Sequence, residues 1–531
     1  MLRLTWAQPE DLIGHELRQA RLDGRDASAV AARWRAAGGD EAPSRAGASA
    51  RPASPRLRLL AEDLLDELAG LPAPLADSEP TDLERIRALC PDWPLRAPAA
   101  PMPPTRPETT GSESTRLEPT RSKPTRLEPT RPEPTRPEPT RSEPTRPEPT
   151  RPEPTRPEPT RSEPTRPEPT RLEAAWLGRA VGCLLGKPVE KLPLTGIRRL
   201  GRAAGNWPPT TYFTARGVPS GLLTAYPWNR RSAPTSLAEN IDGMPEDDDL
   251  NYPLLGLLLL QRHGRAFTTA DVARVWLDEL PAGRTFTAER LAYRNLLTGI
   301  EPPDTARHRN PFREWIGALI RADVHGWTNP GDPGAAAGQA HRDAVLTHTA
   351  NGVYAAMFAA AVIATAATGT ADVHACLRTG LAVVPPGSRL AEAVRHAVRL
   401  AAAHADFDAV VDELHAVHSP AHHWVHAVPN TALIAAALTH AGGDFTGSLA
   451  RVVSGGWDTD SNGATVGGVA ALLAGSPAAL PGHWTAPLKN RLATSVGDFD
   501  GTGFDTLAHL THREATRPCP SPPPLPPSPL P

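Results

Sequence analysis

A tract of tandem repeats limits where this chain can fold. From Arg116 to Thr170 the sequence consists of eleven consecutive copies of the unit Arg-x-Glu-Pro-Thr, in which x is Pro, Ser or Leu and Lys123 replaces one Glu. Every copy contains a proline, which interrupts helices and sheets, and none carries enough apolar surface to offset the entropy lost on folding. We therefore predict a disordered spacer here. Binding of a partner that recognises proline-rich segments is the alternative role.

The prolines and the apolar residues are distributed unevenly along the 531 residues, and this distribution predicts the domain boundaries. The 62 prolines are concentrated in the repeat tract and in the C-terminal tail. Before the tract, apolar residues occur at helical spacing, as in Leu12-Ile13-Leu17. We predict a helical N-terminal region of unknown role at 1–100, a disordered linker at 101–171, a folded domain at 172–512 and a disordered proline-rich tail at 513–531.

The segment after the repeat tract has the pattern of an all-α domain. Runs rich in Ala, Leu and Val alternate with helix-capping residues, and no stretch alternates apolar and polar residues for long enough to form a sheet. Thr268 and Asp271 form a capping box before one such run, and Gly264 and Gly369 occur where helices should end. These features predict a domain of about ten or more helices.

Charge and cysteine content exclude several classes of function. The formal net charge is −3, which provides no general attraction to nucleic acid or to an anionic membrane. The four cysteines, Cys90, Cys183, Cys376 and Cys519, are far apart and form no Cys-x-x-Cys pair, so we expect free thiols in a reducing cytoplasm. The N-terminus lacks the apolar run of a signal peptide, and no apolar segment reaches the about 20 residues that span a membrane.

The motif with the clearest chemical meaning is Gly455–Gly463. Asp458 and Asp460 are followed by Ser461 and then an amide side chain, so hard oxygen atoms gather in one turn between two apolar segments. A helix cap explains only one of the two acids. An EF-hand is excluded because Val469 occupies position twelve, where a bidentate Glu is required. We therefore predict half of a divalent-cation site.

A run of four acids, Glu246–Asp249, is the predicted source of the other half. Adjacent carboxylates repel each other unless solvent or metal ions neutralise them. The run precedes an apolar helix that contains Pro253, which we expect in the first helical turn. The helix dipole stabilises each carboxylate there by only about 0.3 to 1 kcal/mol, so we expect a divalent cation to balance the repulsion.

Three segments, Gly178–Glu190, Glu246–Asp249 and Gly455–Ala464, occur in this order in the chain. Together they resemble the ADP-ribosylglycohydrolase family, which includes dinitrogenase reductase-activating glycohydrolase. The resemblance covers about residues 172 to 512. It implies an orthogonal bundle of helices around a centre of two Mg²⁺ or Mn²⁺ ions.

The resemblance also implies a set of metal ligands, because members typically hold the ions with a Thr-Asp-Asp triplet and a later Asp-x-Asp-Ser/Thr. The corresponding residues here are Glu246, Asp247, Asp248, Asp458, Asp460 and Ser461. Glu246 replaces the usual Thr, and its extra negative charge should tighten cation binding or change the preferred ion. Cys183 replaces an Asp that often follows Gly in the first motif, so any hydrogen bonds of that Asp are missing here.

The activity implied by the resemblance is hydrolysis of a glycosidic bond. The bond joins ADP-ribose, or a related ribosyl compound, to a protein side chain or a small leaving group, so the implied partner is an ADP-ribosylated protein or an ADP-ribose conjugate. Glu190 matches a catalytic glutamate of some members, and the alternative is a surface carboxylate paired with Lys187 or Lys191. We expect Arg313 to contact the pyrophosphate and His348 to contact the substrate, although a surface ion pair is the simpler role for Arg313.

Two other interpretations compete with this one. The first is a catalytically impaired member that binds ADP-ribose or has a structural role, because Glu246 and Cys183 depart from the family pattern. The second is a zinc site in the histidine cluster His418–His426. The thermolysin-type motif needs Glu directly after its first His, but His423 follows His422 here, so we interpret the cluster as pocket or loop lining.

Overall fold

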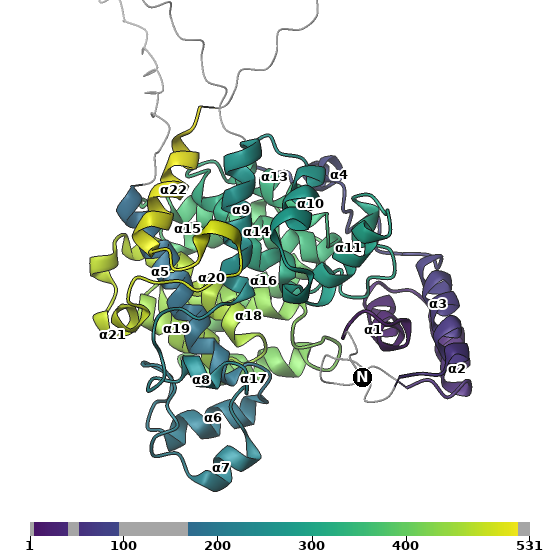
Figure 1. Ribbon diagram of the computed structural model, residues 1–531, viewed down its shortest axis with the longest axis horizontal. Helices are drawn as coiled ribbons and strands as arrows, with labels where there is room; N and C mark the ends of the chain where they lie inside the picture. Colours follow the sequence, from purple (N-terminus) through teal and green to yellow (C-terminus); the bar gives the residue numbers. More distant parts are fainter. Residues whose placement is uncertain (1–4, 41–51, 95–167, 519–531) are drawn as a thin grey trace, which may run out of the picture. The chain divides into compact units, whose positions relative to one another are not determined.

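The computed structural model of the chain describes residues 5–40, 52–94 and 168–518. These residues form 22 α-helices joined by loops and 3₁₀ turns, and no β-strand occurs among them (Figure 1). The prediction of an all-α fold is therefore confirmed. The predicted disorder of the spacer up to residue 167, and of the tail from residue 519, falls outside the described residues.

The helices form two groups along the chain. Four precede the repeat tract: α1 (Pro9–Leu22), α2 (Ser28–Ala36), α3 (Pro55–Ala69) and α4 (Leu83–Leu89). The others follow it: α5 (Pro169–Gly186), α6 (Leu194–Ala203), α7 (Ser220–Ala225), α8 (Ala233–Ser236), α9 (Asp248–His263), α10 (Thr269–Glu279), α11 (Thr287–Leu297), α12 (Asp323–Trp327), α13 (Pro333–Ala344), α14 (Ala350–Ala366), α15 (Val373–Ala382), α16 (Arg389–Ala403), α17 (Phe407–His418), α18 (Ala427–Ala441), α19 (Phe445–Ser454), α20 (Thr459–Ala474), α21 (Gly482–Thr485) and α22 (Phe504–Thr516).

Two helices that carry predicted motifs, α5 and α20, pack backbone against backbone (Figure 1). Gly178, Gly182 and Gly186 recur every four residues in α5, which places them on one face of the helix. A Cβ atom added at Gly182 would overlap the carbonyl group of Gly463 in α20. Across the same contact, Thr459 Oγ1 donates to Gly186 O at 2.8 Å. The glycines of the first motif therefore let the start of α20 lie directly beside the end of α5.

Helix α9 begins at the second acidic motif, with Asp247 as its N-cap residue and Gly264 as its C-cap residue. The expected position of Pro253 in the first turn is wrong, because this residue lies one turn further into the helix. Its missing N–H leaves the Asp249 carbonyl without the usual helical donor. The buried Arg179 of α5 compensates, since its Nε donates to Asp249 O at 2.7 Å. This bond attaches the start of α9 to α5.

Helix α5 begins inside the last copy of the repeat. Pro169 is its first residue, a position that tolerates proline because no helical N–H bond is needed there. The expectation that every repeat copy stays out of helices is therefore wrong for this copy. At the other end of the domain, α22 extends to Thr516. The predicted boundaries at residues 172 and 512 thus cut into two helices.

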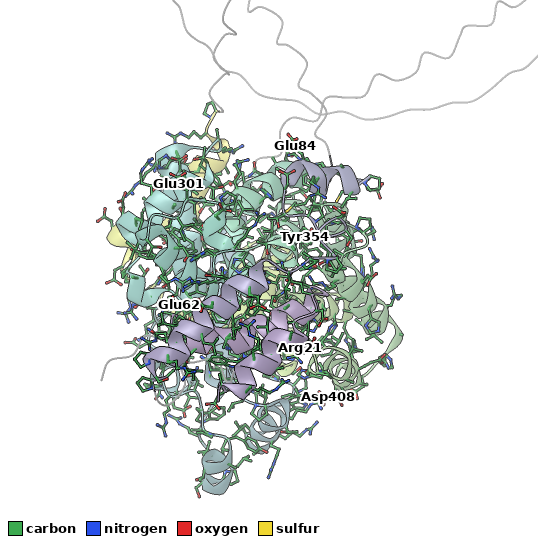
Figure 2. The ribbon with its side chains drawn as sticks, turned by 90° about the vertical axis from the view of Figure 1, so that its right-hand side faces the viewer. Arg21, Glu62, Glu84, Glu301, Tyr354 and Asp408 are labelled. Atoms are coloured by element: carbon green, nitrogen blue, oxygen red, sulfur yellow. The ribbon has the colours of Figure 1, made fainter. Side chains whose placement is uncertain are left out.

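The N-terminal region is helical, as predicted, and packs against the domain that follows the repeats (Figure 2). Gln19 of α1 donates to Glu314 at 2.8 Å, and a ring nitrogen of His341 bonds to Thr81 O at 2.8 Å. Tyr354 in α14 also bonds to a carbonyl of the segment between α3 and α4. The described residues on both sides of the repeat tract therefore belong to one compact unit.

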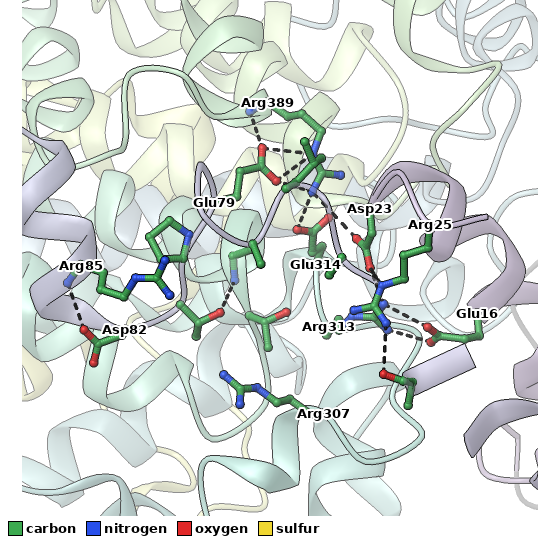
Figure 3. Close-up of a pocket in the computed structure, with 18 of the residues that line it drawn as sticks. Glu16, Asp23, Arg25, Glu79, Asp82, Arg85, Arg307, Arg313, Glu314 and Arg389 are labelled. Carbon is green, nitrogen blue, oxygen red and sulfur yellow. Dashed lines mark hydrogen bonds and ion pairs between the residues drawn. The ribbon is translucent and has the colours of Figure 1, made fainter. Parts of the chain in front are cut away.

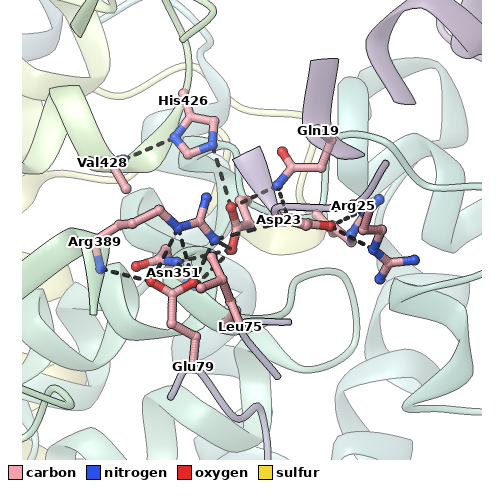
Figure 4. Close-up of polar contacts among 12 residues, drawn as sticks. Gln19, Asp23, Arg25, Leu75, Glu79, Asn351, Arg389, His426 and Val428 are labelled. Carbon is pink, nitrogen blue, oxygen red and sulfur yellow. Dashed lines mark hydrogen bonds and ion pairs between the residues drawn. The ribbon is translucent and has the colours of Figure 1, made fainter. Parts of the chain in front are cut away.

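Buried ion pairs connect the two parts of the chain. Arg313 donates to Glu16 and to Asp23 at 2.7 Å each. Arg389 donates to Glu79 at 2.6 Å, within a network that also includes His426 and Asn351 (Figure 4). Removing one partner of such a pair leaves a buried charge unpaired, which costs about 3–5 kcal/mol. The N-terminal helices are therefore fixed to the domain by charge as well as by apolar packing.

A pocket of about 420 Å³ lies where these two parts of the chain meet (Figure 3). Six arginines and five acids line it, including Arg85, Arg307 and Arg313. Most of these charges are already paired, as in the ion pair between Arg313 and Asp23. The pocket contains no residue of the three motifs.

Several local predictions are confirmed. Thr268 and Asp271 form a capping box at the start of α10, with bonds in both directions. Gly264 ends α9, and Gly369 follows α14, each with a positive φ.

Cys90, Cys183 and Cys376 are buried free thiols, as the spacing of the cysteines predicted, and Cys519 lies outside the described residues. Among residues 5–40, 52–94 and 168–518, no helix combines the length and the apolar character that a membrane crossing requires.

Candidate functional site

One pocket of about 320 Å³ collects residues of all three motifs. It lies where the end of α5, the start of α9 and the start of α20 meet. The predicted catalytic and metal-binding residues all line it: Glu190, Glu246, Asp247, Asp248, Asp458, Asp460 and Ser461. Acids that are far apart in the sequence therefore surround one pocket.

The start of α20 contributes three of these residues. Asp458 is the N-cap residue, and Asp460 and Ser461 lie in the first turn. The turn before the helix passes through Gly456 at φ 74° and Trp457 at φ 57°, which are left-handed conformations. Asp458 is 5% exposed and Asp460 is 8% exposed. Both carboxylates are thus buried at the edge of the pocket.

Burial and like charge disfavour ionisation of these aspartates. Burial, together with the charges of Asp460 and Glu190, raises the pKa of Asp458 well above its ordinary value. Burial and Glu190 raise the pKa of Asp460 to about 7. Across the pocket, burial and Asp247 raise the pKa of Asp248. Within the described ranges, no lysine or arginine forms an ion pair with Asp248, Asp458 or Asp460. The residues therefore fit a divalent cation, which would neutralise this excess negative charge.

Asp247 differs from these acids because it has a cationic partner. Lys187, just after α5, is 6% exposed, and its ammonium pairs with Asp247 Oδ2. Burial alone would raise the pKa of Asp247, but the charge and hydrogen bond of Lys187, together with the Asp249 N–H and the Cys183 thiol, hold the pKa below its ordinary value. Asp249, two residues further along the chain, faces the guanidinium of Arg179 at 3.5 Å. Arg179 also pairs with Asp323 at 2.8 Å. This side of the pocket therefore already contains two buried cations.

Glu190 lies on the other side, near the start of α20. A carboxylate oxygen of Glu190 lies within 4.8 Å of oxygens of Asp458 and Asp460. Asn229 Nδ2 donates to Glu190 Oε2 at 2.7 Å, and Lys191 Nζ pairs with Oε1 at 2.6 Å. Glu190 therefore makes the ion pair of the alternative interpretation and also faces the aspartates.

Glu246 lines the pocket, but its carboxylate is bonded to three other groups. Arg284 pairs with Oε2 at 2.8 Å, while Asn251 Nδ2 and the Ser495 N–H donate to Oε1 at 3.2 and 3.1 Å. These bonds connect the loop before α9 to its neighbours. The role of Glu246 as a metal ligand stays a prediction, and its contacts favour a structural role.

Two groups of side chains in the described part of the chain are close enough to share a cation. One consists of Glu190, Asp458 and Asp460, and the other of Cys183, Asp247 and Asp249. In the second group, burial raises the pKa of the Cys183 thiol well above its ordinary value, so the thiol stays protonated at neutral pH.

Aromatic and basic side chains form the rest of the pocket wall, among them Arg231, Arg284, Trp315 and Trp424. The N-terminal segment contributes Trp6, which packs edge-on against Phe286 with ring centroids 6.2 Å apart. The guanidinium of Arg290 lies over both rings. The sequence gives no sign that Trp6 belongs to the pocket, because this residue is distant from the motifs and nothing in its local sequence marks it as a pocket residue.

The two predicted substrate-binding residues do not line this pocket. Arg313 is bonded to Glu16 and Asp23 and lines the arginine-rich pocket instead. His348 is fully buried, and its Nδ1 bonds to Thr347 Oγ1 at 2.6 Å. Their positions therefore give no support to the predicted substrate contacts. The acids that bind Arg313 come from α1 and its C-terminal end, a contact that the local sequence around Arg313 does not reveal.

The histidine cluster lines a neighbouring cavity of about 870 Å³, which agrees with its interpretation as pocket lining. His422 and His423 face this cavity together with Glu190. No three histidine nitrogens of the described residues gather closely enough to hold a metal ion. A zinc site here therefore has no support in the structure.

Comparisons with known proteins cover the same part of the chain. The family model described as ADP-ribosylglycohydrolase matches residues 164–518, which include all three motifs. A solved structure named ADP-ribosylglycohydrolase-related protein complex is 22% identical over 65% of this chain and 98% of that chain, with a TM-score of 0.40. A search of curated proteins finds no match.

Proposed function

The chain belongs to the ADP-ribosylglycohydrolase family, and we propose that it hydrolyses the glycosidic bond between ADP-ribose and a protein side chain or small leaving group. A related ribosyl compound is the other substrate class compatible with the family. The observation that carries the proposal is the convergence of Asp248, Asp458, Asp460 and Glu190 on one pocket, where among the described residues no lysine or arginine forms an ion pair with any of the three aspartates.

We assign the metal-holding role to Asp458 and Asp460, with Glu190 and Asp248 facing the same space. Their hard oxygen atoms suit Mg²⁺ or Mn²⁺. When bound, such an ion supplies Lewis-acid stabilisation and orients the substrate. The contact of α20 with α5 fixes the positions of Asp458 and Asp460, the residues that would hold the ion.

Glu190 is the proposed general acid–base group. Asn229 orients its carboxylate through a 2.7 Å hydrogen bond, and Lys191 pairs with its other oxygen at 2.6 Å. In the reaction, the oxygen of a water molecule bonds to C1 of the ribose while the bond from C1 to the leaving group breaks. Glu190 takes the proton of the water or donates one to the leaving group as oxocarbenium character develops.

The aromatic wall supplies a proposed site for the adenine base. Trp6 and Phe286 expose ring surface to the pocket, and aromatic contacts of this kind contribute about 0.5–1.5 kcal/mol beyond area burial. Arg231 and Arg284 are the basic residues in position to bind the pyrophosphate. The N-terminal region thereby gains a proposed role, since it completes the pocket through Trp6.

A catalytically impaired member that only binds ADP-ribose is the second candidate function. The engagement of Glu246 by Arg284 favours it, because a predicted ligand is then withdrawn from the metal. The uncompensated charge at Asp458 and Asp460 favours hydrolysis. The spacer role of residues 101–171 and a cytoplasmic location stay predictions.

A substrate panel tests the proposed function. Proteins ADP-ribosylated on arginine, serine or acidic side chains, together with acylated ADP-ribose, are incubated with the full chain, and released ADP-ribose is measured. We expect release from at least one substrate, its loss with a chelator and its return with Mg²⁺ or Mn²⁺. Binding of ADP-ribose without release from any substrate would instead support the impaired member.

A further inference from the structure

Lys187 places a positive charge inside the acidic pocket, next to residues to which the family resemblance assigns metal ions. Its ammonium pairs with Asp247 Oδ2 and lies 3.5 Å from Glu246 O. The side chain is only 7% exposed, so solvent does little to screen this charge.

We propose that the pocket holds one divalent cation, at Glu190, Asp458 and Asp460, and that the Lys187 ammonium takes the place of a second ion at Asp247. The inference deepens the proposed function and rests on it, because it concerns the metal centre of the same site.

The charges around Asp247 support this assignment. Asp247 and Asp249 are the two carboxylates of their group, and each has an ion-pair partner: Lys187 pairs with Asp247, and Asp249 shares Arg179 with Asp323, which lies closer to it at 2.8 Å. Cys183, the third member, is fully buried and donates toward Asp249 Oδ2 at 3.7 Å. A divalent ion there would add two positive charges to a buried cluster that already contains the cations Lys187 and Arg179. It would also have to displace the ammonium and leave it buried without a partner, which is strongly unfavourable.

The balance of charge is different in the group formed by Glu190, Asp458 and Asp460. Only Glu190 of these three carboxylates has an ion-pair partner among the described residues, Lys191, whose side chain is 54% exposed and therefore well screened by solvent. The charge of Lys187 also acts on Asp460, but its ion pair is with Asp247. Asp248 of α9 adds a fourth carboxylate to the same pocket. A single divalent ion at Asp458 and Asp460 thus relieves the charge that the protein itself leaves uncompensated.

Metal stoichiometry measured on the full chain tests the proposal. The metal-free protein is dialysed to equilibrium against Mn²⁺, bound manganese is counted by elemental analysis, and electron paramagnetic resonance reports whether the ions are magnetically coupled. We expect one Mn²⁺ per chain with the spectrum of an isolated ion. Two ions per chain in the wild type, or none, would overturn the proposal.

Two lysine variants identify the residue responsible. Lys187→Met keeps the length of the side chain and removes its charge, so we expect a second Mn²⁺ per chain and a coupled spectrum. Lys191→Met, the matched control, removes a solvent-screened lysine and should leave the stoichiometry at one. A Lys187→Met protein that is folded by circular dichroism but still binds one ion would contradict the role of Lys187. If Lys187→Met does not fold, the number of Mn²⁺ ions bound per wild-type chain still tests the proposal.

The same measurement separates this inference from the proposed function. Two ions in an active enzyme would refute the inference and leave the function standing. One ion in a protein that hydrolyses no substrate of the panel would support the inference and refute the function.

Discussion

The close contact between α5 and α20 makes a strong prediction for Gly182→Ala. The added Cβ falls far inside the 3.0 Å limit that real Cβ contacts respect, and the atoms it meets belong to the Gly463 carbonyl, which cannot rotate away. The two helices must therefore separate by about 1 Å, a distortion that well-packed cores resist. Overpacking of this kind costs about 1–3 kcal/mol, and the gain of about 0.5–1 kcal/mol from replacing a helical glycine offsets only part of it.

We expect Gly182→Ala to reduce catalytic turnover strongly and to reduce the stability of the fold only modestly. Asp458 and Asp460 lie at the start of α20, so a separation of the helices moves them relative to Glu190 and Asp248. A misplacement of about 1 Å can reduce turnover about 100-fold. We expect Gly182→Ala to lower the midpoint of thermal unfolding by a few degrees and to lose roughly that factor in kcat, measured well below the unfolding temperature.

Gly338→Ala provides a matched control. Gly338 also lies inside a buried helix, α13, but its added Cβ meets only the flexible end of Arg87 at 3.5 Å. This variant should keep full activity and remain as stable as the wild type or gain up to about 1 kcal/mol. If Gly182→Ala behaves like Gly338→Ala in both assays, the packing of α5 on α20 does not position the acids.

Three further predictions concern the N-terminal helices and the pocket they complete. Trp6→Ala should raise KM about 2- to 10-fold with kcat nearly unchanged, whereas Trp6→Phe should restore most of the affinity; equal KM values in steady-state kinetics would exclude Trp6 from the substrate site. Arg313→Ala should destabilise the chain by about 3–5 kcal/mol in denaturant unfolding, because Glu16 and Asp23 lose their shared partner, and adding Glu16→Gln should recover part of that loss; strict additivity would contradict the pairing. Burial lowers the pKa of His15 to about 3, so its contribution to stability is present above pH 6.5 and is lost as the pH falls below that value. Between pH 7 and pH 5, the free energy of unfolding of the wild type should therefore fall by about 2 kcal/mol more than that of His15→Phe. Parallel pH profiles of the two unfolding free energies would refute this assignment.

The sequence alone predicts those features that depend on neighbouring residues. The capping box at Thr268, the helix end at Gly264 and the helix that starts beside Asp247 all follow from local hydrogen-bonding rules. The start of α20 is less well predicted, because it follows a left-handed turn at Trp457, a conformation that residues other than glycine rarely adopt.

Contacts between distant residues account for what the sequence does not predict. The family resemblance brings the two acidic motifs together, but neither motif indicates that Lys187 pairs with Asp247. The position of Pro253 is tolerated because Arg179, from another helix, bonds to the carbonyl that proline leaves free. Arg313 forms ion pairs with Glu16 and Asp23, which precede the repeat tract in the sequence. Such pairings depend on the packed structure rather than on local spacing.

The central claim is that carboxylates from both acidic motifs form one metal-dependent hydrolytic site. The most direct test measures the initial rate of ADP-ribose release as Mn²⁺ is added back to chelated protein, for the wild type, Asp248→Asn and Asp460→Asn. Our account predicts a wild-type rate that rises from zero and saturates with Mn²⁺, and losses of about 100-fold in both variants while their circular dichroism is unchanged. A wild-type rate that is indifferent to the chelator, with full activity in both variants, would contradict it.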